Sequence, residues 1–192
     1  MQNDFTSGSL GSEEARAIVP NVAAFLTKFL EEHGKSRVIF TKDTHEKNYL
    51  ETSEGRHLPV EHCILGTDGW NIVPELGQIV FSYTKRHPED QASVLVVEKP
   101  AFGSVELPEI MTEMGARFED CAADDRLDGE GVIIHLMGLC TDICVVSNAL
   151  LLKAHFPEAR VMLHRSCCAG TTKEAHEAAL TVMKSCQLEI ED

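Results

Sequence analysis

The feature that most constrains this sequence is the alternation of short apolar runs with longer segments of helical periodicity. Short apolar runs without interleaved polar residues are typical of strands that are buried on both faces of a parallel sheet. Because helical segments separate these runs, we expect an α/β fold with a mostly parallel sheet. The predicted strands are residues 37–41, 94–97, 132–137, 160–163 and 188–190.

Helical spacing is clearest near the N-terminus, where apolar side chains recur at i, i+3, i+4, i+7 and i+8. This spacing predicts an amphipathic helix with one buried face. Its apolar side chains are Val22, Phe25, Leu26, Phe29 and Leu30. Further helices are predicted at residues 105–114, 141–155 and 171–186.

Two segments give weaker patterns. Residues 46–75 are rich in Glu, Gly, Pro and His without a clear period, so we expect a long loop that carries functional residues. Residues 77–91 are left unassigned, because the apolar run 79–81 could form a strand but charged residues follow it.

The composition excludes several classes of function. The 192 residues include 31 Asp and Glu against 17 Lys and Arg, a formal net charge of −14, which repels nucleic acid and anionic lipid. No apolar run approaches the roughly 20 residues that span a bilayer, and residues 1–10 do not resemble a signal peptide. We therefore expect one cytoplasmic domain that binds neither nucleic acid nor membranes.

The seven cysteines do not suggest a disulfide framework, because their number is odd and they are scattered. Cys140 and Cys144 have CxxxC spacing, and Cys167 and Cys168 are adjacent, so neither pair resembles a zinc knuckle or a thioredoxin motif. Most of these thiols are expected to be small buried apolar side chains.

Three polar residues directly follow predicted strands, where ligands bind in open parallel sheets. Cys144 is expected in the first turn of a helix, where backbone N–H groups and the helix dipole favour a thiolate nucleophile. A core cysteine is an equal alternative. Asp43 and Lys99 follow two other strands, and Lys99 taken alone is more typical of a solvated lysine.

A set of oxygen and nitrogen donors begins at Asp43 and His45, two residues apart. His57 and His62 follow, and mixed carboxylate and imidazole donors suit zinc, iron or manganese. The carboxylates between His45 and His62 include Glu51, Glu54 and Glu61. The pattern predicts a divalent metal site, for which it is a moderately specific signal.

Several of these residues lie in motifs that together resemble the isochorismatase-like cysteine hydrolases, most closely the nicotinamidases. The motifs follow the family order and cover nearly the whole chain. They are QNDF at 2–5, TKDTH at 41–45, HC at 62–63 with GT at 66–67, KP at 99–100 and GLCTDIC at 138–144.

The resemblance implies a three-layer α/β/α fold and an Asp, Lys, Cys triad that deamidates nicotinamide to nicotinate and ammonia through a thioester. Lys99 matches the triad lysine and Cys144 the nucleophile. The backbone N–H groups of Cys140 and Cys144 would form the oxyanion hole, with a cis peptide bond between Leu139 and Cys140. Phe5 matches an aromatic residue that lines the substrate pocket.

The resemblance also implies one divalent metal ion, zinc in the first instance with iron or manganese as alternatives. Its ligands would be Asp43, His45, Glu54 and His62, and His57 competes with Glu54 for the third place. The resemblance alone also implies a homo-oligomer and a role in pyridine nucleotide metabolism.

Two departures from the family pattern leave other functions open. The family's catalytic Asp would fall immediately before Met1, so we expect residues 1–192 to form one hydrolase domain that lacks its first strand and its general base and is inactive. Asp4 matches the family's second acidic residue there. Residues 59–61 replace an aromatic followed by prolines. The alternatives are another carboxamide or ureide hydrolase, or a non-catalytic truncated member.

Overall fold

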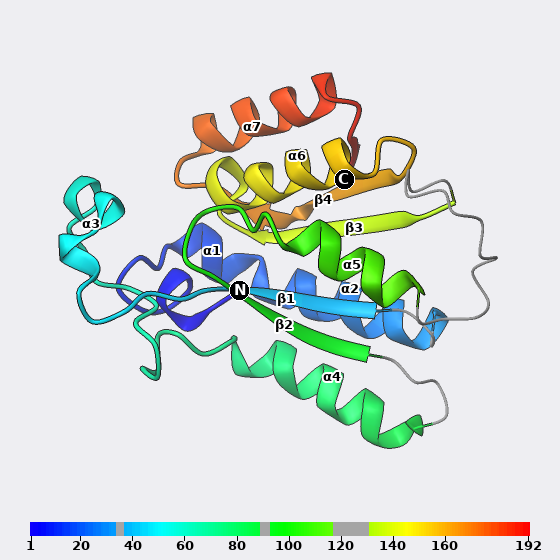
Figure 1. Ribbon diagram of the computed structural model, residues 1–192. Coiled ribbons are helices and arrows are strands. Elements are labelled where there is room, and N and C mark those ends of the chain that lie inside the picture. The colour runs from blue at the N-terminus through cyan, green and yellow to red at the C-terminus, as the bar shows by residue number, and fades with distance from the viewer. Residues whose placement is uncertain (34–36, 89–92, 117–130) are drawn as a thin grey trace. The chain divides into compact units, whose positions relative to one another are not determined.

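Parallel strand pairs organise both parts of the chain. The computed structural model describes residues 1–33, 37–88, 93–116 and 131–192 (Figure 1). Two compact units, Met1–Ala101 and Phe102–Asp192, each contain one sheet. Every strand pair in both sheets is parallel, which confirms the predicted α/β class.

The first unit carries a sheet of two strands, β1 (Arg37–Asp43) and β2 (Ser93–Lys99). Residues pair in unbroken register from Arg37 with Ser93 to Asp43 with Lys99, so the two strands end side by side. The helices of this unit are η1 (Asn3–Phe5), α1 (Glu13–Ala17), α2 (Val19–Glu32), η2 (Tyr49–Glu51), α3 (Ser53–His57) and α4 (Pro74–Arg86).

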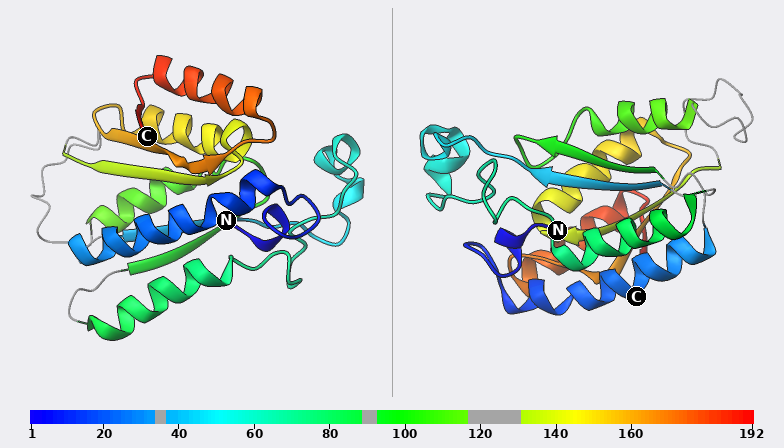
Figure 2. Two further views of the ribbon diagram at one scale, coloured as in Figure 1. Left: turned by 180° about the vertical axis from the view of Figure 1, so that it is seen from behind. Right: turned by 90° about the horizontal axis from the view of Figure 1, so that it is seen from below.

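The core of the first unit lies between α2, α4 and β1 (Figure 2). The predicted helix at 22–30 is confirmed, and its Leu26 and Leu30 pack against Val80 and Tyr83 of α4. Further apolar side chains packed against this cluster are Val38, Phe40 and Ile79.

The interpretation of residues 46–75 as one long loop is wrong, because this segment contains η2, α3 and the start of α4. Pro74 stands in the first turn of α4, where its missing N–H needs no partner. The unassigned segment 77–91 continues this helix to Arg86. The run 79–81 resembles a strand, but Phe81 is 68% exposed, and the buried side chains have helical spacing.

The second unit has a sheet of three strands in the order β3 (Ile133–Leu139), β4 (Arg160–Ala169) and β5 (Glu189–Glu191). The register of β3 and β4 shifts between Leu136 and Gly138, where Gly138 has a φ of 128° that favours glycine. Its helices are α5 (Leu107–Ala116), the π-helical turn η4 (Thr141–Val145), α6 (Val146–His155) and α7 (Lys173–Ser185).

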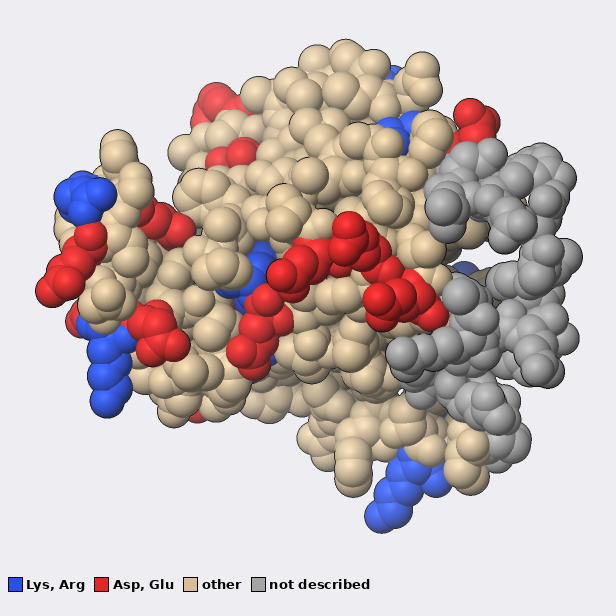
Figure 3. All heavy atoms as spheres, in the orientation of Figure 1, with Lys and Arg blue, Asp and Glu red and all other residues tan. Residues whose placement is uncertain are grey.

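The sequence carries a formal net charge of −14. Figure 3 shows side chains of Asp and Glu exposed on one face of the molecule. Among the residues that the structure describes, no helix combines the length and the apolar character needed to cross a membrane.

We predict that Leu30→Ala lowers the free energy of unfolding by about 2–5 kcal/mol, because it leaves a cavity where the Leu30 side chain is fully buried. The matched control Phe81→Ala removes a larger but exposed side chain from α4 and should change stability by less than about 0.5 kcal/mol. Urea denaturation of both variants measures the difference. Equal losses would contradict the core described above.

Candidate active site

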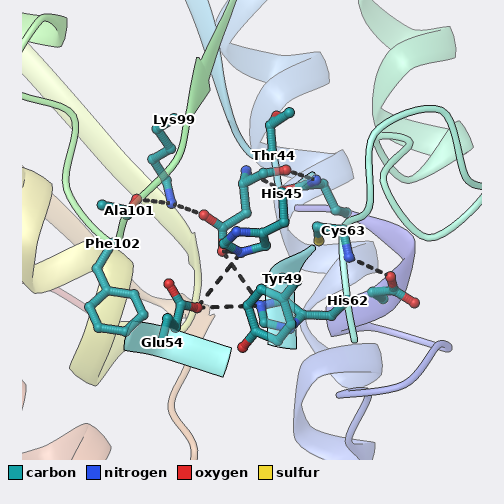
Figure 4. A network of polar contacts seen from close by, with 12 residues as sticks. Thr44, His45, Tyr49, Glu54, His62, Cys63, Lys99, Ala101 and Phe102 are labelled. Carbon is teal, nitrogen blue, oxygen red and sulfur yellow. Dashed lines mark hydrogen bonds and ion pairs between the residues drawn. The ribbon is translucent and has the colours of Figure 1, made fainter. Parts of the chain in front are cut away.

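An ion pair joins the ends of β1 and β2 (Figure 4). Lys99 Nζ lies 2.8 Å from Asp43 Oδ1, both side chains are 3% exposed, and the ammonium also donates to Ala101 O at 3.0 Å. Burial by itself would raise the pKa of Asp43, but His45 and the Lys99 ammonium outweigh it and hold the pKa below its ordinary value. Asp43 is therefore an ionised carboxylate.

Four side chains gather around this ion pair: Asp43, His45, Glu54 and His62, referred to below as the ligand group. One donor atom from each lies within 4.8 Å of the others. His45 Nε2 lies 3.8 Å from Asp43 Oδ2 and 3.7 Å from Glu54 Oε1. His62 Nε2 lies 3.9 Å and 3.7 Å from the same two oxygens.

The spacing of the ligand group fits a divalent cation. Its nitrogen–oxygen distances are too long for hydrogen bonds, and His45 Nε2 is buried without a hydrogen-bond partner in the described parts of the chain. Ligand atoms about 2.0–2.2 Å from a tetrahedral ion lie about 3.3–3.6 Å from one another. The distances here are close to that spacing, so a shared ion would satisfy the four side chains together.

Hydrogen bonds and ring contacts orient the two imidazoles. His62 Nδ1 lies 2.9 Å from Val60 O, a pure acceptor, so Nδ1–H donates to this carbonyl and Nε2 faces the ligand group. The buried ring of Tyr49 contacts His45 at 4.7 Å and His62 at 5.0 Å between centroids. Burial raises the pKa of Tyr49 to about 12, and its hydroxyl donates to Leu58 O at 3.0 Å.

The helix α3 delivers Glu54 to the ligand group. The hydroxyl of Thr52 caps this helix by accepting from Gly55 N at 3.0 Å. Position 55 requires glycine, because a Cβ there would lie 2.1 Å from Tyr49 O. Burial raises the pKa of Glu54, although the neighbouring His45 opposes the shift. His57, the alternative third ligand, is exposed on the same helix, bonds Ser53 O and lies outside the ligand group.

The QNDF segment supports the ligand group from one side. The amide of Gln2 donates to Asp43 O at 2.8 Å and accepts from Asp43 N at 2.7 Å. The carboxylate of Asp4 accepts from Cys63 N at 2.7 Å, and the ring of Phe5 meets that of His62 edge to face at 5.5 Å. Three side chains of one short motif thus hold Asp43 and the residues at 62–63.

Cys63 is part of this support and not a reactive thiol. Its side chain is fully buried, and burial raises the pKa of the thiol. Its φ of 46° lies in the left-handed region, and its N–H bond to Asp4 stabilises that conformation. The thiol is therefore protonated and serves as a small apolar side chain.

Cys144 lies in the second unit, directly after β3, and is half-buried. The peptide bond between Leu139 and Cys140 is cis, as predicted. Residues 141–155 are helical as predicted and Cys144 lies in the first turn, but that turn is the π-helical η4, and α6 begins only at Val146. Cys140 O accepts from both Ile143 N and Val145 N at 3.1 Å, which closes this wider turn.

Side chains at the N-terminus of α7 anchor η4. His176 Nδ1 lies 2.9 Å from Thr141 Oγ1, and the Asp142 carboxylate accepts from Thr171 N at 2.8 Å and from the Thr171 hydroxyl. No sequence pattern marked the supporting roles of His176, Gln2 and Tyr49. His176 is 35 residues from Thr141 and Gln2 is 41 residues from Asp43, so no local pattern could mark these two contacts.

The chain thus combines parallel α/β sheets with a carboxylate–imidazole group after β1 and a cysteine in the π-helical turn that follows β3. The isochorismatase domain matches residues 1–192, so the chain belongs to the isochorismatase family of hydrolases. The predicted family is thereby confirmed. This single match also spans both compact units.

Named relatives of this chain include PncA proteins. The chain is 28% identical over 181 residues to the isochorismatase family protein PncA of Bacillus subtilis (strain 168), covering 93% of this chain and 87% of the relative. The crystal structure of nicotinamidase/pyrazinamidase PncA from Bacillus subtilis gives a TM-score of 0.74 at 25% identity, covering 100% of this chain and 94% of the other.

Two further solved structures are similar to this chain. The pyrazinamidase of Pyrococcus horikoshii, solved in complex with zinc, gives a TM-score of 0.72 at 27% identity and covers 100% of this chain and 94% of the other. The N-carbamoylsarcosine amidase from Thermoplasma acidophilum gives 0.68 at 21% identity, covers 100% and 91%, and shows the fold alone.

We predict that Asp4→Ala lowers the melting temperature more than Asp4→Asn does. The alanine variant leaves the N–H of Cys63 without its charged acceptor, a loss of about 1.5–3 kcal/mol. The asparagine variant keeps one oxygen that can accept this bond. Thermal unfolding followed by circular dichroism in a chelating buffer measures both variants, and equal melting temperatures would contradict the role assigned to Asp4.

Proposed function

We propose that the protein is a metal-dependent cysteine amidohydrolase that deamidates nicotinamide to nicotinate and ammonia. The observation that carries the proposal is the ligand group, with the unpartnered Nε2 of buried His45, in a chain of the isochorismatase family. Similarity to a nicotinamidase/pyrazinamidase and to a zinc-containing pyrazinamidase supports it.

Asp43, His45, Glu54 and His62 would hold the cation, and zinc is the ion that two imidazoles and two carboxylates suit well. When bound, the ion supplies a Lewis-acid position that can accept the ring nitrogen of a pyridine carboxamide. The 2.8 Å contact with Lys99 helps to keep the Asp43 carboxylate ionised. Lys99 would therefore have two roles, one in catalysis and one in holding a ligand of the cation.

Phe5 would contribute to binding the aromatic ring. Its side chain is half-buried, and its ring meets His62 edge to face, so an aromatic surface adjoins the ligand group. Aromatic rings favour such offset or edge-to-face contacts over face-to-face stacking. Fixing the ring of the substrate in one orientation lowers the entropic part of the barrier to reaction.

Cys144 would be the nucleophile. Its thiolate attacks the amide carbon, and the backbone N–H groups of Cys140 and Cys144 would receive the oxyanion. The C–N bond then breaks, the nitrogen takes a proton and leaves as ammonia, and a thioester remains. Water hydrolyses the thioester to the carboxylic acid and restores the thiol.

The thiol proton must pass to a base, a role that the family resemblance assigns to an aspartate. We assign Asp4 a positioning role, because its carboxylate accepts from the backbone of Cys63 and of Ser9. Lys99 does not serve as the base, since an ammonium has no lone pair. A single domain match over residues 1–192 supports our view of one hydrolase domain.

In a preparation that deamidates nicotinamide, we predict that Cys144→Ala reduces ammonia release to below about 0.1% of the parent rate, because the covalent step is lost. Metal content should not change. The control Cys186→Ala removes an exposed cysteine and should keep full activity. Parent-level turnover in Cys144→Ala would overturn the mechanism. Ammonia release from N-carbamoylsarcosine but not from nicotinamide or pyrazinamide would overturn the proposed substrate class.

We predict that the purified protein binds about one equivalent of zinc. Glu54→Ala should weaken zinc affinity at least tenfold, on the order expected when a ligand is lost. His57→Ala, on the same helix, should leave the affinity unchanged because His57 lies outside the ligand group. Competition with a chromogenic chelator measures both variants, and the reverse order would assign the third ligand to His57.

A further inference from the structure

The side-chain amide of Asn148 makes three hydrogen bonds to backbone groups of the second unit. Its Oδ1 accepts from Ser104 N at 2.9 Å, and its Nδ2 donates to Phe102 O at 3.2 Å and to Cys144 O at 2.7 Å. Asn148 lies in the first turn of α6 and is 7% exposed. One buried amide therefore joins the backbone of residues 102–104 to the backbone of Cys144.

Close packing at Gly103 gives an independent sign that this segment is fixed on α6. A Cβ added at Gly103 would lie 2.9 Å from Leu151 Cδ1 and 3.4 Å from Ser147 Cβ. A side chain at position 103 would therefore contact Ser147 and displace the end of the Leu151 side chain, so Gly103 packs against α6. Ser104, the next residue, is 6% exposed and bonded to Asn148.

We infer that Asn148 is a positioning residue for Cys144, an inference that rests on the proposed function. Its bond to Cys144 O fixes the peptide plane that follows Cys144 and therefore the direction of the cysteine Cα–Cβ bond within η4. Single π-helical turns occur frequently at functional sites. Asn148 adds to the backbone hydrogen bonds of η4 a side chain that is itself held at Phe102 and Ser104.

The experiment compares Asn148→Ser and Asn148→Asp with the parent and with Leu152→Val, a packing control in the same helix at a site 1% exposed. The serine hydroxyl is too short to reach both carbonyls, and the aspartate places an acceptor where Nδ2 donates. Alkylation of Cys144 by iodoacetamide, read by peptide mass spectrometry, separates this thiol from the other cysteines. Nicotinamide turnover gives kcat and KM.

Both Asn148 variants should alkylate Cys144 about tenfold more slowly and lose about 10- to 100-fold in kcat with KM within twofold, because misplacement affects the chemical step. Asn148→Asp should also move the pH midpoint of alkylation upward, since a nearby carboxylate disfavours the thiolate. Leu152→Val should match the parent in both assays.

Parent-like alkylation and kcat in both folded variants would overturn the inference, and so would an equal loss in Leu152→Val. If circular dichroism shows that Asn148→Asp is unfolded, Asn148→Ser decides the question. A parent protein that does not hydrolyse nicotinamide, with slower Cys144 alkylation in the Asn148 variants, would refute the proposed function and support the positioning role.

Discussion

The ion pair between Asp43 and Lys99 is the interaction on which the ligand group depends. The two residues are paired in register at the ends of β1 and β2, and both side chains are almost completely buried. Removing one partner would leave a buried charge uncompensated, a change that typically costs about 3–5 kcal/mol. A slip of one residue would bring Lys42 beside Lys99 and turn Asp43 to the other face of the sheet. The register of two strands thus determines whether the site can exist.

The structure gives a physical reason for the QNDF segment, whose side chains act as supports in the first unit. The amide of Gln2 pairs with both backbone groups of Asp43, as a neighbouring strand would. Asp4 stabilises the left-handed backbone at Cys63, one residue after His62. Such outer contacts orient ligands and usually matter for affinity almost as much as the ligands themselves.

The sequence was sufficient to predict the parallel α/β class, the strand positions and the family, because these depend on local periodicity and on ordered motifs. It was insufficient for α4, since the run 79–81 resembles a strand until the exposure of Phe81 is known. The short α3 depends on the cap at Thr52 and has no period to detect. Glu54 and His57 lie on one helical turn, and only its orientation places Glu54 in the ligand group. The contacts of Asn148 with residues 102–104 and of Gln2 with Asp43 join segments far apart in the sequence, so no local pattern predicts them.

The contacts that build the ligand group are long-range in sequence. Gln2 is 41 residues from Asp43, Lys99 is 56 residues from it, and Asp4 is 59 residues from Cys63. Closing such loops is entropically unfavourable, and contacts of this kind tend to slow folding. The ligand group therefore depends on contacts from residue 2 to residue 99, across nearly all of the first unit. Cation affinity would then report on the integrity of that whole unit, and an ion that binds only the native form would shift its folding equilibrium by mass action.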